Sequence, residues 1–231
     1  MLPSHSALTN STRYNGQAQF ENYVHAASFP CVGARSAINR GRAVFRTYSQ
    51  LAEPPSSERL CADLQQFSTD FPKPEGDPVT FVAMFRAAVR SEDHFESLMW
   101  QHLQLMHQHD RAEFEWDSTV SADPSDSNFS FSIAGRAFFV VGLSPVAPRL
   151  ARRAPMPCLV FNFHNQFEAL RASAKYAGLQ CVVRNRDLML QGSINPMLDV
   201  FGEASEARQY SGRAHDAAWT CPFHAETTHA H

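Results

Sequence analysis

Three short apolar runs constrain the fold of this chain most strongly, because each is rich in β-branched and aromatic residues. VTFVAMF spans residues 79–85 and CLVFNF spans residues 158–163. Between them, FSFSI alternates apolar and polar residues, AGR provides a turn, and AFFVVGL runs back over residues 137–143. Runs of this length and composition predict strands, and the middle pair predicts a β-hairpin. The fold therefore contains a sheet that buries at least one face.

A helical pattern follows the first of these runs. Ser91 can cap a helix whose first turn holds Glu92 and Asp93, because acidic side chains are favoured beside the free N–H groups of a helix N-terminus. One apolar stripe then recurs at helical spacing, formed by Phe95, Leu98, Met99, His102, Leu103 and Met106. His102 belongs to this stripe, so we expect it in the core.

Four further segments carry secondary-structure predictions. We expect a helix over ARSAINRGRAVFRTYSQL, after Pro30, and a helix from Ser57 to about Phe67. NQFEALRASAKYAG predicts a helix that ends at Gly178, and QCVVRNRDLMLQG predicts a strand pair or a strand with a turn. Strands and helices thus interleave irregularly. This order favours an α+β fold, a single domain with a mixed or mainly antiparallel sheet packed by helices.

Composition bounds the class of protein. The chain has 231 residues, of which 44% are hydrophobic and 19% charged, with a formal net charge of −3. A nearly balanced charge argues against non-specific nucleic-acid binding, and no apolar run reaches membrane-spanning length. We expect a loose segment over residues 1–19, one domain over 20–223 and a disordered tail over 224–231. The first residues lack a basic region followed by an apolar one, so we expect a cytoplasmic protein.

The five cysteines are odd in number, scattered, and form no CxxC pair. Cys31 lies just before an expected helix, where the helix dipole and free N–H groups stabilise a thiolate. Gly33 would let the backbone approach a flat cofactor closely. The alternative is a small buried hydrophobic residue. Cys221, in WTCPF, is a second candidate ligand. We expect the others in the core or without a special role: Cys61, Cys158 and Cys181.

Several polar residues are candidates for binding or catalysis. His164 lies at an expected strand-to-helix turn in FNFHNQFEALR, and histidine is a common metal ligand and acid–base group; a capping or core histidine is the alternative. Glu168 and Arg171 share a helical face and can simply pair. A Pro-rich segment carries three arginines that could grip a carboxylate or form a solvated loop: Arg149, Arg152 and Arg153.

Two more clusters complete the candidates. Glu203, Glu206 and Arg208 lie in a polar stretch beside glycines, which suggests a pocket wall. His102, His107 and His109 lack the i, i+4 spacing or the carboxylate companion that zinc or non-haem iron usually requires. The chain has no GxSxG elbow, P-loop, GxGxxG fingerprint or CxxCH haem-attachment motif.

Taken together, several long segments resemble the YqcI/YcgG family over about residues 20–223. They are FPCVGARSA, FVAMFR, HFESLMWQHLQLMHQHD, FFVVGLSPVAPRLARR, LVFNFHNQFEALR, QGSINPMLDVFGEASEARQYSGR and WTCPF. The chain is most similar to the branch of haem-dependent guanitoxin-pathway (pre-guanitoxin) N-hydroxylases, and also to L-arginine N-hydroxylases. The chain departs from this pattern at Ser144, in GLSP, where the resemblance leads us to expect a histidine.

The resemblance implies that residues 20–223 form a haem-binding catalytic domain of specialised metabolism. This domain would hold haem b non-covalently and hydroxylate a nitrogen of L-arginine or a related guanidino or amino substrate. The reaction would use O2 with an electron donor, or peroxide. The exact substrate, the electron donor and the oligomeric state, with a homodimer among the options, stay open.

Site roles follow from chemistry. Thiolate ligation favours O–O cleavage, so Cys31 is the favoured iron ligand, with Cys221 and His164 in reserve. His164 and Glu168 are the catalytic candidates, and His164 could also contact the haem. We assign the three arginines to haem propionates or the substrate carboxylate, and Glu203, Glu206 and Arg208 to the substrate. The alternatives are a non-catalytic haem sensor or carrier, and a non-haem iron oxygenase that uses the histidines.

Overall fold

One five-stranded mixed sheet organises the molecule, with strand order β1-β2-β5-β4-β3. The computed structural model describes residues 15–72, 78–171, 173, 176–196 and 204–226. The strands are β1 (Ala43–Tyr48), β2 (Thr80–Phe85), β3 (Phe131–Ile133), β4 (Arg136–Leu143) and β5 (Cys158–Phe163). β1 and β2 run parallel, and the other neighbours are antiparallel. The three apolar runs therefore form strands as predicted, in a mixed sheet.

The central hairpin forms where the sequence predicts it. β3 and β4 are joined at Ala134 and Gly135, whose φ angles are 53° and 67°. Positive φ at both central residues matches the right-handed twist of the flanking strands, and the strands pair Phe131 with Phe138. This hairpin brings the end of β3 close to β4 and leaves the outer edge of β4 beyond Phe138 for another element.

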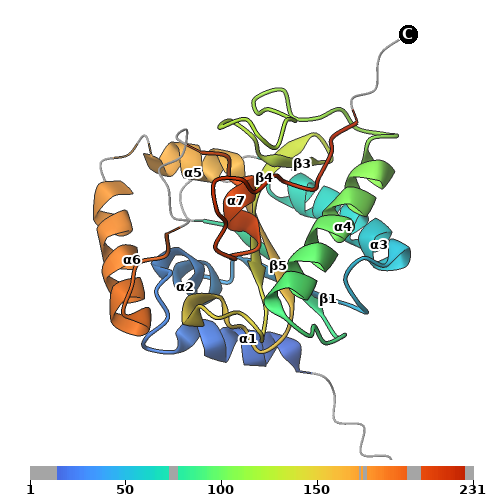
Figure 1. Ribbon diagram of the computed structural model, residues 1–231. Coiled ribbons are helices and arrows are strands. Elements are labelled where there is room, and N and C mark those ends of the chain that lie inside the picture. Colours follow the sequence, from blue (N-terminus) through green and yellow to red (C-terminus); the bar gives the residue numbers. More distant parts are fainter. Residues whose placement is uncertain (1–14, 73–77, 172, 174–175, 197–203, 227–231) are drawn as a thin grey trace, which may run out of the picture.

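Helices cover both faces of the sheet (Figure 1). α3 (Pro54–Asp70) and α4 (Glu92–Asp110) lie on one side. α1 (Gly16–His25), α2 (Val32–Asn39), α5 (His164–Arg171) and α6 (Tyr176–Gln191) lie on the other. The short α7 (Ala207–Tyr210) contacts β4, and the 3₁₀ turn η1 (Leu150–Arg152) contacts α6. The described residues form a single α+β domain.

The alternation of side chains along each strand divides the core into two clusters. Phe81, Phe138 and Phe161 point to the α3/α4 side, where they join a large aromatic cluster. On the other side, Val82 and Cys158 pack in the cluster that α1 covers with Phe20 and Val24. His102 is fully buried on the α3/α4 side, as its place in the apolar stripe of α4 predicts.

Two predicted helices have different boundaries in the structure. α2 ends at Asn39, and Gly41, with a φ of 65°, allows the turn into β1; the prediction of one helix through Leu51 is therefore wrong. α3 begins at Pro54 rather than Ser57. Proline is favoured in the first turn of a helix, because its missing N–H needs no partner there.

The region after β5 differs most from the prediction. α5 ends at Arg171, and residues 176–191 form α6, so Gly178 lies inside a helix and the predicted strand pair is wrong. The inward-facing positions recur with helical period, since Val183 and Leu190 are half-buried and Asp187 is buried. Cys181 is exposed on this helix, which corrects the expectation of a core position.

Both ends of the described chain are more ordered than predicted. α1 begins at Gly16 and is capped by the Asn15 side chain, so residues 16–19 are helical rather than loose. The backbone N–H of His224 donates to Gln104 Oε1 at 2.9 Å, and Glu226 pairs with Arg111. Residues 1–14 and 227–231, the rest of the predicted loose ends, lie outside the described residues.

Among the described residues, no helix has the length and apolarity that crossing a membrane requires.

Candidate active site

The direct junction of a strand and a helix positions His164. β5 ends at Phe163 and α5 begins at His164, so the imidazole lies at the end of the sheet, as predicted. Gln166, one turn into α5, accepts a hydrogen bond from the Val79 N–H at 2.6 Å and donates to the Val79 carbonyl at 3.1 Å. This pair attaches α5 to the start of β2. The His164 side chain is consequently held in place and buried.

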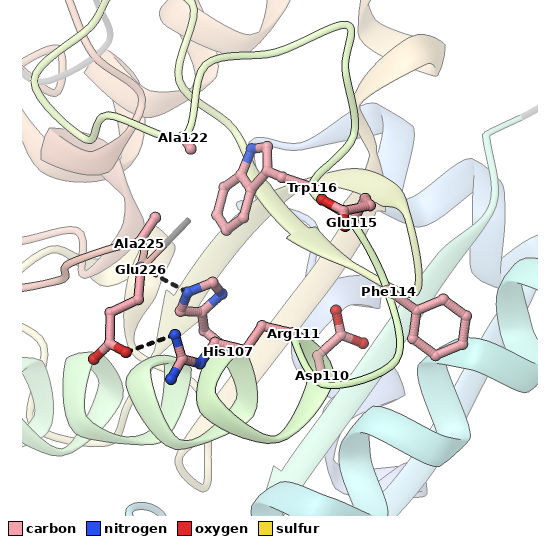
Figure 2. A pocket seen from close by; sticks show the side chains of 9 residues that line it. All are labelled: His107, Asp110, Arg111, Phe114, Glu115, Trp116, Ala122, Ala225 and Glu226. Atoms are coloured by element: carbon pink, nitrogen blue, oxygen red, sulfur yellow. Dashed lines mark hydrogen bonds and ion pairs between the residues drawn. The ribbon is translucent and has the colours of Figure 1, made fainter. Parts of the chain in front are cut away.

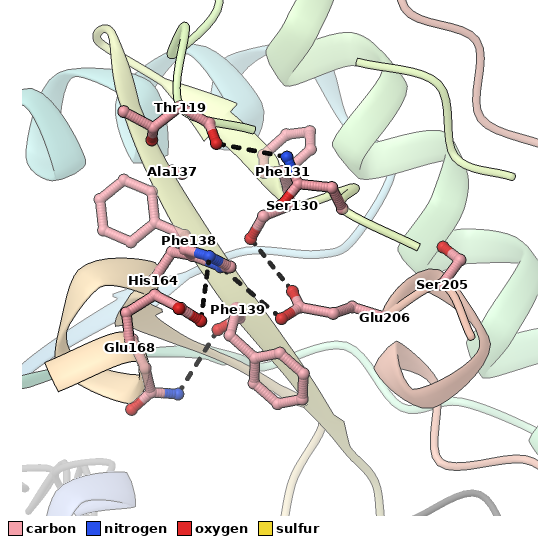
Figure 3. Close-up of polar contacts among 12 residues, drawn as sticks. Thr119, Ser130, Phe131, Ala137, Phe138, Phe139, His164, Glu168, Ser205 and Glu206 are labelled. Carbon is pink, nitrogen blue, oxygen red and sulfur yellow. Dashed lines mark hydrogen bonds and ion pairs between the residues drawn. The ribbon is translucent and has the colours of Figure 1, made fainter. Parts of the chain in front are cut away.

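Two carboxylates flank the imidazole of His164 (Figure 3). Its Nδ1 lies 3.6 Å from Glu206 Oε1, and its Nε2 lies 3.7 Å from Glu168 Oε1, one helical turn along α5. Glu206 immediately precedes α7, and its Oε2 accepts a hydrogen bond from the hydroxyl of Ser130 at 3.1 Å. Three candidates from distant parts of the sequence thus meet in one site.

Burial sets the protonation of this cluster. Burial raises the pKa of Glu206 to about 8, although the hydrogen bond from Ser130 and the charge of Arg171 oppose the shift. Burial lowers the pKa of His164 below its usual value, against the opposing charge of Glu168. At neutral pH Glu206 therefore mostly holds a proton and the imidazole is neutral. A neutral acid beside a neutral base suits proton transfer.

The geometry favours acid–base chemistry at His164 over its reserve role as an iron ligand. A ligating histidine needs one ring nitrogen directed at an open coordination position. Here both ring nitrogens lie within 4 Å of a carboxylate oxygen. Histidine between two carboxylates can take a proton on one nitrogen and release one from the other.

A half-buried apolar strip extends from this site across the α1/α2 side of the sheet. Phe139 of β4 contacts Phe167 of α5, with ring centroids 5.3 Å apart. Val141 and Val160 continue the strip towards the cluster beneath α2 and are half-buried. Asn162 lies beside Phe139 and donates to its carbonyl at 3.5 Å. A half-buried apolar strip of this kind can contact the face of a planar ligand.

Cys31 caps α2, as its place before the expected helix predicts. Its Sγ accepts a hydrogen bond from the Ala34 N–H at 3.5 Å, and the side chain is exposed. The position that a Cβ of Gly33 would take lies 3.9 Å from this sulfur, an ordinary contact. Cys31 therefore presents an accessible sulfur atom at the N-terminus of a helix.

The structure does not bring Cys31 and His164 together. Cys31 lies near Tyr23 and Arg152, whose electrostatics it influences, and Arg152 donates to the carbonyl of Gly142 near the end of β4. His164 follows the opposite end of the β4–β5 pair. Six residues of extended strand span roughly 20 Å. His164 therefore does not face a group bound directly at Cys31.

The three arginines bind other parts of the chain. Arg149 pairs with the buried Asp187 of α6 at 2.7 Å. Arg152, half-buried, donates to backbone carbonyls of β4 and α7, and burial lowers its pKa to about 10. Arg153 donates to the carbonyls of residues 147 and 148. The structure therefore does not direct their guanidinium groups towards one shared anion, and their assignment to propionates stays a prediction.

The remaining candidates lie apart from His164. Arg208 donates to the carbonyls of residues 215 and 216 in the C-terminal segment, and Glu203 lies outside the described residues. Ser144 is buried, and its Oγ has no hydrogen-bond partner among the described residues. Cys221 is half-buried, and burial raises the pKa of its thiol to about 12. A thiol that resists ionisation is a poor iron ligand.

The described residues show no metal site at the histidines of α4, which are His102, His107 and His109. His102 Nδ1 accepts the Ala52 N–H at 3.1 Å, and burial lowers the pKa of this histidine to about 3. His107 Nε2 accepts the Glu226 N–H at 3.0 Å beside a small pocket at the end of α4 (Figure 2). Across the described part of the chain, no three His, Cys, Asp or Glu residues gather as metal ligands.

Sequence reasoning missed two residues of the site. Ser130 hydrogen-bonds Glu206, and the charge of Asp117 acts on His164. Asp117 Oδ2 accepts the N–H of Ala137 at 2.9 Å, which fixes it beside β4. The alternation in FSFSI was a usable signal for Ser130, because it places Ser130 and Ser132 on one face of the strand. Both serines are buried although they occupy the polar positions. For Asp117, the sequence carries no comparable signal.

The chain is similar to known proteins over nearly all of its described domain. The sequence model of the YqcI/YcgG family matches residues 20–224. The chain is 24% identical over 210 residues to "Uncharacterized protein YcgG" of Bacillus subtilis (strain 168). The aligned region covers 86% of this chain and 81% of that protein. No solved structure matches the chain. The match over nearly the whole described domain means that this chain belongs to the YqcI/YcgG family.

Proposed function

We propose that the protein is a haem-dependent N-hydroxylase, a monooxygenase that acts on L-arginine or a related guanidino or amino substrate. The observation that carries this proposal is the accessible thiol of Cys31 at the start of α2. The resemblance of the chain's long segments to N-hydroxylases supports the reaction and the substrate class. Glu168, beside His164, supports a cationic substrate, since a carboxylate matches the planar donors of a guanidinium.

The residues present fit a haem group in two respects. Cys31 offers an exposed thiol at the start of α2, where its Sγ accepts the Ala34 N–H. Val141 and Val160 offer half-buried apolar side chains on the same side of the sheet, which suits a flat macrocycle. Bound haem with a thiolate ligand would supply the activation of O2. Cys31 would hold the iron, and the apolar strip would contact the porphyrin.

The chain's own residues would bind the substrate and move protons. Glu168, half-exposed, can pair with a cationic nitrogen that enters from solvent. Glu206 and His164 lie deeper, at the end of the β4–β5 pair opposite to Cys31, and would exchange a proton with a part of the substrate remote from the iron. The overall reaction converts substrate N–H, O2, two electrons and two protons into N–OH and water. An electron donor of the reductase class, or peroxide in place of O2 and electrons, completes the balance.

A spectrum of the reduced, CO-treated protein tests the ligand. We expect the long-wavelength Soret band of a thiolate complex in the wild type and its loss in Cys31→Ala. Cys181→Ala is the matched control, because Cys181 is also exposed but lies on α6. If Cys31→Ala keeps the thiolate spectrum, Cys31 is not the ligand, and Cys221→Ala is the next variant to measure.

Product analysis tests the reaction. We expect mass spectrometry to detect the addition of one oxygen to L-arginine or a simpler guanidine, when O2 and a reductant, or peroxide, are supplied. Haem binding without product from any of these substrates would instead indicate a sensor or carrier. Iron without a Soret band would indicate a non-haem enzyme.

A further inference from the structure

We propose that the pocket at the end of α4 binds a small organic cation of the guanidinium type. The pocket lies between the last turn of α4, the loop that leads to β3, and the C-terminal segment at Ala225 and Glu226 (Figure 2). Trp116, in its wall, packs against the core cluster on the α3/α4 side of the sheet. Cys31 precedes α2, which packs on the other side. The binding of this cation therefore does not depend on haem or on the proposed reaction.

The carboxylate of Asp110 is the buried anionic group of this pocket. Asp110 is 8% exposed, and its Oδ1 accepts the Ala134 N–H at 2.9 Å. Its other oxygen has no hydrogen-bond or ion-pair partner within the described ranges of the chain. Burying a carboxylate without a cationic partner costs free energy. An oxygen in this state at the wall of a pocket therefore marks a place for a positively charged N–H donor.

Asp110 is mostly ionised at neutral pH although it is buried. Burial raises the pKa of Asp110 to about 6, and the hydrogen bond from Ala134 opposes this shift. The charge of His109 also lowers this pKa, whereas that of Glu113 raises it. His107 lines the pocket as well, but burial lowers its pKa below the usual value. His107 is therefore neutral and does not supply a positive charge to Asp110.

The other charged groups leave the pocket negative. Arg111 pairs with Glu226 at 2.6 Å, so their charges compensate each other. Glu115 lines the pocket and is exposed, and it adds a second carboxylate to that of Asp110. The lining thus holds three carboxylates and one guanidinium group. A concave surface with this excess of negative charge attracts a cation from solvent.

The walls favour a planar organic cation over a metal ion. No group of three potential metal ligands occurs in the part of the chain that the structure describes, and the walls include the rings of Trp116 and Phe114. An aromatic face attracts a cation, and a guanidinium stacks on it well because it is planar and weakly hydrated. The pocket has a volume of about 60 Å³, where one water molecule needs roughly 15 Å³. This space suits a single small head group.

An NMR titration of the purified full chain at pH 7.5 tests the site. The probe is methylguanidinium, and methylurea is the matched neutral probe because it has nearly the same planar shape without the charge. The chain has three tryptophans, and the indole N–H signal of Trp116 is the one that disappears in Trp116→Phe. We expect methylguanidinium to shift this signal saturably and to leave those of Trp100 and Trp219 unchanged. Methylurea should bind about tenfold more weakly or less, since it makes no charged hydrogen bond.

A pair of variants tests the role of the buried carboxylate. Asp110→Asn keeps an oxygen that can accept the Ala134 N–H but removes the charge, so we expect it to weaken methylguanidinium binding about tenfold or more. Glu113→Gln removes the same charge just after α4, where Glu113 is exposed and does not line the pocket. Its affinity should stay within about twofold of the wild type, because exposed charges interact weakly.

Equal binding of the two probes would overturn the proposal, because the site would then not recognise charge. Unchanged affinity in Asp110→Asn, or equal losses in the two variants, would overturn it as well. A shift of the Trp100 or Trp219 signal without one at Trp116 would place the cation elsewhere, and the absence of saturable binding would exclude the site. The comparison of the two probes uses the wild type alone, so it decides the question even if a variant fails to fold.

Discussion

The carboxylate of Glu96, on α4, lies 3.0 Å from Nε2 of His215, on the segment that follows α7. The same buried carboxylate accepts hydrogen bonds from Ser211 and Arg213, both at 2.9 Å. The imidazole of His215 stacks on Trp219, with ring centroids 4.1 Å apart. Since Glu206 and α7 immediately precede these residues, this network determines where the buried acid of the site lies.

We therefore expect Glu96→Gln to lower the free energy of unfolding by about 2 kcal/mol, because the charged hydrogen bonds of a buried carboxylate are lost. Urea unfolding measures the change. Glu113→Gln is the control, since Glu113 is exposed in the turn that follows the same helix, and it should have little effect. A loss in Glu96→Gln no larger than that of the control would mean that solvent replaces the network.

The hydroxyl of Tyr210 connects α7 to the central hairpin. It accepts the Phe131 N–H at 3.1 Å and donates to the Phe138 carbonyl at 3.3 Å, both in the core. We expect Tyr210→Phe to cost about 1–3 kcal/mol of unfolding free energy, since it leaves a buried N–H unpaired. Thermal and urea unfolding check this value. Tyr48→Phe should cost less, because its partner Asp63 is partly exposed and can bind water.

Sequence reasoning succeeded for four strands of the sheet and failed for β1 and α6, for physical reasons. β-branched and aromatic residues in short runs specify strands regardless of what packs on them, so β2, β4, β5 and the hairpin were predicted. In α6, the pair Val182–Val183 suggests a strand locally, but a strand there would need a sheet edge. Arg152 and Tyr210 already bind the carbonyls of β4 along its outer edge, and the sequence does not show this.

The candidate site was predicted in part. His164 was identifiable because a strand and a helix meet there, and Glu206 because of its polar surroundings. Their contact is set by tertiary packing, since α7 docks on β4 more than 40 residues after α5 begins. The role of the arginines was not predictable either. Arg152 satisfies backbone carbonyls inside the fold, and no local pattern distinguishes that from binding a ligand.

A pair of glycine substitutions tests the packing of β4. A Cβ on Gly142 would lie 2.8 Å from the Tyr210 carbonyl oxygen and 2.9 Å from Phe95 Cε1, so we expect Gly142→Ala to destabilise the fold by about 1–3 kcal/mol. Gly178, inside α6, has nothing within 4 Å of that position. Gly178→Ala should therefore stabilise the helix by up to about 1 kcal/mol. Thermal unfolding of both variants measures the sign of each change in stability.

Opposite signs would confirm that Gly142 is needed for close packing and that Gly178 is an interior helix position. Destabilisation in Gly178→Ala would contradict the assignment of residues 176–191 to a helix. Stabilisation in Gly142→Ala would contradict the close approach of α7 to β4.

The burial of Glu206 makes stability depend on pH in a direction opposite to that of a salt-bridged acid. Its pKa is about 8 in the folded protein, against 4.5 for an ordinary glutamate. Between these values the folded state binds more protons than the unfolded state, so stability falls as pH rises. Ionising this carboxylate inside the fold should cost about 3 kcal/mol between pH 5 and pH 8.

Glu206→Gln removes this cost, because an amide does not ionise. We expect the variant to gain stability relative to the wild type as pH rises, by about 3 kcal/mol between pH 5 and pH 8. Urea unfolding at several pH values measures the difference. Asp110→Asn should act in the same direction at lower pH, since burial raises the pKa of Asp110 from 3.8 to about 6. A difference between Glu206→Gln and wild type that stays constant from pH 5 to pH 8 would show that Glu206 ionises freely, and Glu206 would then not store a proton at neutral pH.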